Sequence, residues 1–275
     1  MATLAGKFTG HEPRSDALSG TPRAHAIDRW IFVGMAVWFI AIVLAGFIPD
    51  SIMKVGMVRA GARPPFPPIL HVHAVVMGSF LLLLLTQSVL MATGRKAWHV
   101  QLGVVGMVLA GVLVVVGTML APTMYHQTWN GLQTAPPATR QPLTDLLSWQ
   151  ENILLVQLRI GLVFAVLMTI GLKARQRNDG LHKRMMFLAT AMALPAGIDR
   201  ISWLPSTLPA SPIAPDIYTF LAVSPMLAWD VIRNRRIHEA YWIWLAVWAP
   251  TIVFVNVAWD KPWWHATAKA IMGVS

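Results

Sequence analysis

The stretch that decides the fold is residues 69–92, which read ILHVHAVVMGSFLLLLLTQSVLMA. It contains no Asp, Glu, Lys or Arg. A helix of roughly 20 residues crosses about 30 Å of hydrocarbon, so this run is long enough to span a membrane. Lipid offers the backbone no hydrogen-bond partners, so such a run is expected to be helical throughout. It predicts a transmembrane helix.

Six further apolar blocks of similar length occur along the chain, the one beginning at residue 213 being the weakest. The seven blocks are residues 30–48, 69–92, 100–121, 153–172, 185–204, 213–232 and 241–259. Hydrophobic residues make up 56% of the chain and charged residues 12%, about half the charged fraction of a typical soluble domain. The sequence therefore predicts an all-α, polytopic transmembrane helix bundle with about seven spans, surrounded by the lipid bilayer.

Basic residues predict the orientation of this bundle. The formal net charge is +10, and most Lys and Arg residues lie in the connections between blocks. The connections after the second, fourth and sixth blocks contain Arg95, Lys96, Lys173, Arg175, Arg177, Lys183, Arg184, Arg233, Arg235 and Arg236. The positive-inside rule places these on the cytoplasmic side, although Lys54, Arg59 and Arg63 fall on the opposite side. Membrane orientation accounts for the positive charge, so nucleic acid is not an expected partner.

The predicted domain organisation follows from this orientation. Residues 1–29 are expected to form a retained cytoplasmic tail, since they lack the apolar core and cleavage site of a signal peptide. Residues 30–259 would form the transmembrane domain, and residues 260–275 a short external tail. The expected location is the bacterial cytoplasmic (inner) membrane. The chain has no cysteine, which excludes disulfides, thiolate metal sites, iron–sulfur clusters and covalently attached c-type haem.

One set of polar residues is expected at a similar depth in the outer half of the bundle. Ionisable residues inside spans are costly and are candidates for function. The set comprises His71, His73, His126, Arg159, Asp199 and Arg200. Arg159 and Asp199 are expected to pair, either for function or to hold helices together. His71 and His73 point roughly 200° apart on a regular helix, so they are not expected to ligate one metal ion together.

A second set is expected at the inner face, where three basic turns each end in an apolar residue followed by histidine. These histidines are His99, His182 and His238, and Asp230 lies at the same level. A helix N-terminus disfavours the charged imidazolium, and the neutral ring is the form that binds metals. The three histidines could converge on one metal or haem site, or each could cap a helix at the membrane interface.

Three segments carry a resemblance to a known group of proteins. They are Leu70-His71-Val72-His73-Ala74, residues 94–103 (GRKAWHVQLG) and Leu181-His182-Lys183-Arg184-Met185-Met186. Over residues 69–240 the chain resembles a family of uncharacterised bacterial multi-pass membrane proteins, which is loosely similar to membrane proteins of cytochrome-oxidase assembly. The resemblance implies haem or metal handling, with a respiratory or other membrane complex as a possible partner.

The leading functional hypothesis is binding of haem b or a divalent metal ion, in electron transfer or respiratory cofactor handling. His71, His73, His99 and His182 would hold the cofactor, and Arg159 and Arg200 would pair with anionic groups such as haem propionates. A metal ion would draw on these histidines with His126, His238 and Asp199. The alternatives are a transporter or channel for a small anion or protons, an accessory subunit without chemistry, and a membrane-embedded hydrolase or hydroxylase.

Overall fold

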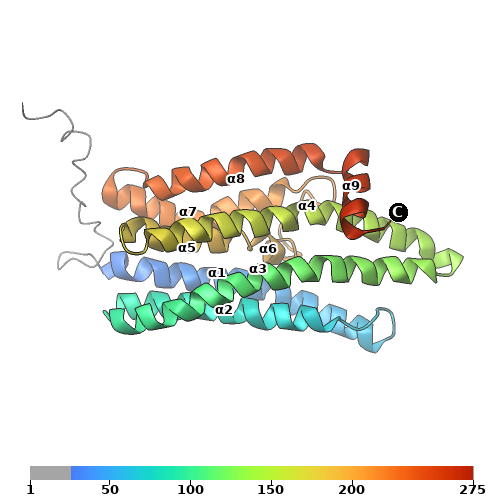
Figure 1. Cartoon of the computed structure of the whole chain (residues 1–275), viewed down its shortest axis with the longest axis horizontal. Helices are drawn as coiled ribbons and strands as arrows, with labels where there is room; N and C mark the ends of the chain where they lie inside the picture. Colours follow the sequence, from blue (N-terminus) through green and yellow to red (C-terminus); the bar gives the residue numbers. More distant parts are fainter. Residues whose placement is uncertain (1–25, 275) are drawn as a thin grey trace, which may run out of the picture.

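The computed structural model describes residues 26–274, and within them the chain forms nine helices and no strand (Figure 1). The helices are α1 Ala26–Arg59, α2 Pro68–Ala92, α3 Lys96–Gln133, α4 Pro137–Ala174, α5 Asp179–Ala191, α6 Pro195–Ile198, α7 Ile213–Asn234, α8 Glu239–Ala258 and α9 Pro262–Met272. The predicted all-α class is confirmed. Most of the predicted N-terminal tail lies outside the described residues, and residues 26–29 belong to α1.

Five of the described helices are long and apolar enough to cross a membrane, namely α1, α2, α3, α4 and α8. In the most apolar windows of α2 and α3, only 11% and 17% of residues are buried. Large apolar side chains cover their outer faces, and Val75, Leu82 and Val108 are each at least 60% exposed. Exposing so much apolar surface to water would be strongly unfavourable. The fold therefore indicates a membrane protein whose helices contact lipid.

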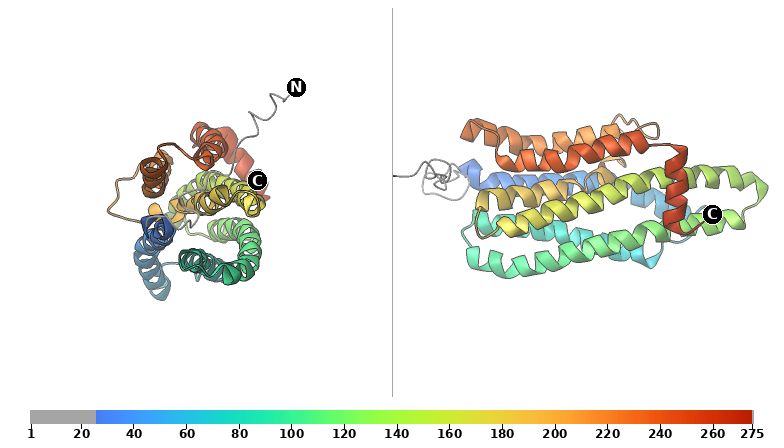
Figure 2. Two further views of the ribbon diagram at one scale, coloured as in Figure 1. Left: turned by 90° about the vertical axis from the view of Figure 1, so that its left-hand side faces the viewer. Right: turned by 45° about the horizontal axis from the view of Figure 1, so that its top comes forward.

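The long helices run side by side along the longest axis of the molecule (Figures 1 and 2). One end carries the connections 93–95, 175–178 and 235–238, and we refer to it as the basic end. The opposite end carries residues 60–67, 134–136 and 259–261, and we refer to it as the α9 end. There α9 lies crosswise to the long helices, while the α3–α4 hairpin continues past it (Figure 1). The predicted external tail thus contains a packed helix.

Two helices continue through prolines at which the apolar blocks were expected to close. α1 passes through Pro49 to Arg59, and α3 passes through Pro122 to Gln133. Proline removes one backbone hydrogen bond, but neighbouring elements can support the helix on both sides of it. Beyond Pro122 the support comes from α4, whose Gln150 donates a hydrogen bond to Thr128 at 3.1 Å. α4 accordingly begins at Pro137, well before the apolar block that starts at residue 153.

The predicted span over residues 185–204 is not one continuous helix. α5 ends at Ala191, turns follow, α6 covers four residues, and the chain from 199 to 212 has no regular helix. Pro195 has no N–H to continue the hydrogen-bond ladder, which explains the break. α7 is regular and contains Asp216, Asp230 and Arg233, and it is not among the five helices that are apolar enough to cross a membrane. A count of seven crossings is not confirmed by these helices.

The broken segment packs tightly against α1 through two glycines. A Cβ atom added to Gly46 would overlap the carbonyl oxygen of Gly197 and lie 2.8 Å from its carbonyl carbon. A Cβ atom on Gly197 would lie 3.2 Å from the Cα atom of Val43. Small residues allow this close approach of backbones, as they do between membrane helices generally. The contact fixes the start of the irregular segment against α1.

Candidate functional site

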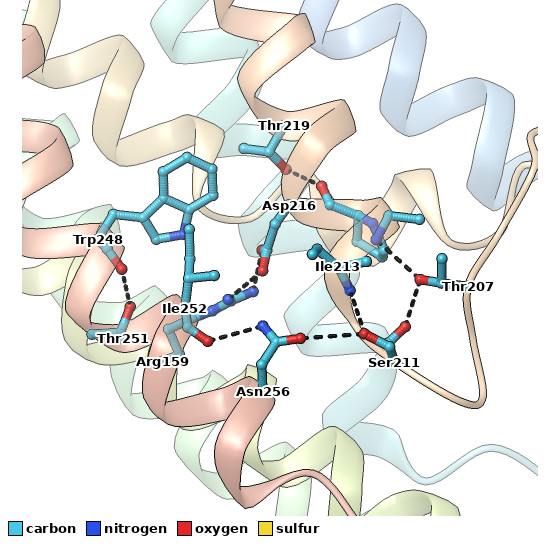
Figure 3. A network of polar contacts seen from close by, with 12 residues as sticks. Arg159, Thr207, Ser211, Ile213, Asp216, Thr219, Trp248, Thr251, Ile252 and Asn256 are labelled. Atoms are coloured by element: carbon cyan, nitrogen blue, oxygen red, sulfur yellow. Dashed lines mark hydrogen bonds and ion pairs between the residues drawn. The ribbon is translucent and has the colours of Figure 1, made fainter.

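A buried ion pair joins α4 to the first turn of α7. Nη1 and Nη2 of Arg159 donate to Oδ2 and Oδ1 of Asp216 at 2.8 and 2.6 Å. Both side chains are 4% exposed. Figure 3 shows the pair among its polar neighbours. Two parallel hydrogen bonds between a guanidinium and a carboxylate make a strong and directional contact. The prediction that Arg159 pairs with Asp199 is wrong. Arg159 pairs with Asp216, which was not among the residues singled out from the sequence.

The irregular segment 199–212 lies beside this pair. Ser211 donates a hydrogen bond to Oδ1 of Asn256 in α8 at 3.2 Å and accepts one from the N–H of Ile213 at 3.3 Å (Figure 3). A cavity of about 260 Å³ is lined by Pro205, Ser206, Thr207, Ala214, Ile217 and Tyr218. Ala214 and Ile217 belong to the same helical turn as Asp216. The charged pair therefore lies beside a polar network, and neighbours of Asp216 in the same turn of α7 line a small cavity.

Asp199 and Arg200 form a separate cluster with α1. Nη1 of Arg200 donates to Asp199 at 2.9 Å, and Nε of Arg200 lies 3.3 Å from Oδ2 of Asp50. Lys54 donates to the same Asp50 oxygen at 2.7 Å. Two cations and two carboxylates thus balance one another, and the guanidinium of Arg200 is engaged by protein groups.

A second buried pair lies nearer the basic end. Nε and Nη2 of Arg184 donate to the two carboxylate oxygens of Asp230, each at 2.6 Å. Tyr241 donates to Oδ2 of Asp230 at 2.6 Å, and Nη1 of Arg184 donates to the Gly180 carbonyl at 2.9 Å. Arg184 and Asp230 are at most 1% exposed. In the sequence, Arg184 is one of the residues of a basic turn. Asp230 was expected at the same level of the bundle, and this was the one indication that Arg184 has a buried partner.

The histidines of the outer set do not gather. His71 is exposed and lies edge-on to Phe66, with ring centroids 6.2 Å apart. His73 is half-buried against α3, and its Nδ1 is enclosed without a hydrogen-bond partner among the described residues. His126, half-buried in α3, has the ring of Tyr125 as a neighbour at 6.2 Å. No contact joins these three rings to one another among the contacts of the described chain.

Two of the three inner histidines do come together. The rings of His99 in α3 and His182 in α5 have centroids 6.4 Å apart. Nδ1 of His182 lies 2.8 Å from the Gly171 carbonyl, which suits a neutral ring with Nδ1 protonated and Nε2 free to bind. His238 instead caps α8, because its Nδ1 accepts a hydrogen bond from the Ala240 N–H at 3.1 Å. The approach of His99 and His182 agrees with the first of the two alternatives that the sequence left open, while His238 follows the capping alternative.

A histidine that the sequence analysis did not consider sits in the most connected polar cluster of the α9 end. Nδ1 of His265 in α9 lies 2.6 Å from Oε2 of Glu151, and its Nε2 lies 3.1 Å from Oδ1 of Asp260. Tyr125 donates to Oε1 of Glu151 at 2.9 Å, and Trp264 donates to the Glu151 carbonyl at 2.8 Å. Residues 260–275 were expected to be a short tail, so nothing in the sequence pointed His265 toward Glu151.

Asp260 lies in the turn between α8 and α9 and faces solvent. The hydrogen bond with His265, and then the one from Asn152, hold the pKa of Asp260 below its usual range. The Asp260 N–H also donates to Oδ1 of Asn152 at 3.0 Å. These contacts fix the turn on α4 and so position α9 above Glu151.

The fit of haem or a metal ion to these residues is limited. Among the described residues, no group of three or more His, Asp or Glu side chains is arranged to hold a metal ion. The guanidiniums of Arg159 and Arg200 are engaged by Asp216, Asp199 and Asp50, so haem propionates would have to displace protein carboxylates. Two small cavities lie around residues 198–218, and neither has a lining histidine. The haem and metal hypothesis stays a prediction.

The fold and its buried charges define a helical membrane protein with ion pairs inside the bundle. No protein-family model, curated protein or solved structure matches the chain.

Proposed function

We propose that this chain is a transport protein that conducts protons across the bacterial cytoplasmic membrane. The observation that carries the proposal is the buried Arg159–Asp216 pair beside a broken helix. In this arrangement the basic end faces the cytoplasm, as the positive-inside rule requires. α5 with α6 forms one crossing and α7 another, giving seven with the five apolar helices.

The depth of the pair supports a role in permeation. Arg159 lies 15 residues from the basic end of α4 at Ala174, or about 22 Å at 1.5 Å per residue, within the roughly 30 Å of hydrocarbon. Charged groups at such a depth mark ion or proton pathways more often than they add stability. Irregular backbone at membrane depth is tolerated where it lines a cavity, and broken helices mark binding sites in transporters.

The chemistry of the pair suits protons. Arginine keeps its proton under all ordinary conditions, whereas a carboxylate can accept one and lose its charge. Proton uptake by Asp216 would weaken its hold on Arg159, and proton release would restore it. The pair can thus alternate between an engaged and a released form.

The test is proton flux into vesicles that contain the purified protein and a pH-sensitive dye. A pH gradient is imposed, and valinomycin with K⁺ balances the charge. We expect proton uptake above that of empty vesicles, and Arg159→Gln to reduce it by about tenfold or more, because Asp216 loses the cation that holds it in place. Arg140→Gln is the matched control, since Arg140 is an exposed residue of the same helix.

Three outcomes contradict the proposal. They are wild-type flux equal to that of empty vesicles, full flux in a folded Arg159→Gln variant, and chloride flux without proton flux. Size-exclusion chromatography of each variant establishes that it is folded.

A second candidate function is metal or haem binding for electron transfer, and the His99–His182 contact favours it. Purified protein would be analysed for metal and by visible spectroscopy before and after reduction. Stoichiometric metal or reduced haem bands that disappear in His182→Ala would support this function. A colourless, metal-free protein, prepared without chelators and with haem supplied during expression, would contradict it.

A further inference from the structure

His265 lies between two carboxylates, one buried and one open to solvent. Its Nδ1 is 2.6 Å from Glu151, whose side chain is 2% exposed, and its Nε2 is 3.1 Å from Asp260, whose side chain is 75% exposed. A neutral imidazole has one donor nitrogen, so it can donate to only one of these carboxylates, whereas the protonated ring can donate to both. The ring therefore connects the surface of the α9 end with a buried acid through two hydrogen bonds.

The elements packed around His265 place few other titratable groups near its contacts with Glu151 and Asp260. α9 lies crosswise over the end of α8 and against α4, as Figures 1 and 2 show. The charged or titratable groups that face His265 or its two partners are Tyr125 from α3, Glu151 from α4, and Asp260 and Lys261 from the α8–α9 turn. Among these, only Glu151 is both buried and able to take a proton from Nδ1.

We propose that Asp260, His265 and Glu151 form a proton relay through which protons reach the interior from the α9 end. The inference rests on the proposed proton conduction and names the residues of its outer mouth. Glu151 and Arg159 are eight residues apart on α4, so the relay ends about 12 Å, or two helical turns, from the Arg159–Asp216 pair. Asn256 lies in α8, four residues before Asp260, and belongs to the polar network beside that pair.

Each step moves one proton and leaves the relay balanced. Asp260 takes a proton from water and transfers it to Nε2 of a neutral His265, forming imidazolium and restoring the Asp260 carboxylate. Nδ1 of the imidazolium then transfers its proton to Oε2 of Glu151, which becomes a neutral carboxylic acid. The ring is left neutral with its proton on Nε2, and exchange with water, in which Nε2 loses one proton and Nδ1 takes one up, restores the starting tautomer at this partly exposed side chain. Tyr125, which donates to the other oxygen of Glu151, stabilises the carboxylate between transfers.

Two substitutions test the relay. Each keeps a polar side chain of similar size and removes a group that can take up a proton. His265→Gln retains a polar side chain of similar reach but cannot be protonated, and Glu151→Gln cannot accept a proton. We expect each to lower proton flux driven from the α9 end by about tenfold or more, as expected for loss of a proton-transfer group. Lys269→Gln is the matched control, because Lys269 is an exposed residue of the same helix as His265 and lies outside the relay.

A second measurement follows the protons directly. In histidine nitrogen NMR of the wild type, the Nδ1 signal of His265 should report the hydrogen bond to Glu151, and Glu151→Gln should shift that signal. Wild-type flux that Arg159→Gln abolishes but His265→Gln preserves would overturn the relay and leave the proposed function standing. Absence of wild-type flux would overturn both. An Nδ1 signal of His265 that Glu151→Gln leaves unchanged would contradict the contact between the two groups.

Discussion

Arg184→Met should lower the free energy of unfolding by about 3–5 kcal/mol, the cost of leaving one partner of a buried ion pair uncompensated. Asp230 would keep the hydrogen bond from Tyr241 but lose both guanidinium contacts in a site that is 1% exposed. Methionine fills much of the volume of arginine, so the loss would reflect the unpaired charge more than a cavity. Reversible unfolding in mixed detergent micelles measures the change.

Two further variants show whether the loss of stability in Arg184→Met comes from the unpaired buried charge. Arg184→Met combined with Asp230→Leu removes both charges and should recover a large part of the lost stability, since an apolar replacement of a buried pair is often neutral or better. Lys54→Met should cost about 1 kcal/mol or less, because Lys54 is partly exposed and Asp50 retains Arg200. Equal losses for Arg184→Met and Lys54→Met would contradict the assignment of a buried pair.

Gly46→Ala should destabilise the protein by about 1–3 kcal/mol, because the added methyl group overlaps the carbonyl of Gly197. That contact is made by backbone atoms, which cannot rotate away as a side chain can. The α1–α6 contact would have to open, and the irregular segment after α6 would move with it. The thermal unfolding temperature in detergent and protease sensitivity of the 199–212 segment would both report the change.

Gly34→Ala is the matched control, since Gly34 is in the same helix and its added Cβ atom would have no neighbour within 4 Å. This substitution should stabilise α1 by about 0.5–1 kcal/mol through its higher helix propensity. A Gly46→Ala variant as stable as Gly34→Ala would show that α1 and α6 do not touch.

The apolar blocks predicted most of the architecture, because long charge-free runs have few other structures open to them in lipid. The helical hairpins and the approach of His99 to His182 followed from the basic turns. Helix ends were less predictable. Pro49 and Pro122 are strong helix breakers in isolation, but packing supports the helices on both sides of them.

The partners of the buried charges could not be read from the sequence. Counting residues along each span placed Arg159 and Asp199 at a similar depth, so they were expected to pair. In the structure the helix is broken before Pro195, and Asp199 lies beside α1 instead. Asp216 is the partner of Arg159 instead, because α7 begins beside Arg159. The packing of α9 depends on a turn at Asp260 with a positive φ of 57°, a conformation that the residue type only weakly indicates.

The measurement that tests the central claim most directly is the initial rate of proton uptake into vesicles that contain wild-type protein or Arg159→Gln. We expect rapid uptake with the wild type and uptake close to that of empty vesicles with Arg159→Gln. Equal rates for the two folded proteins, or no wild-type uptake above empty vesicles, would contradict it.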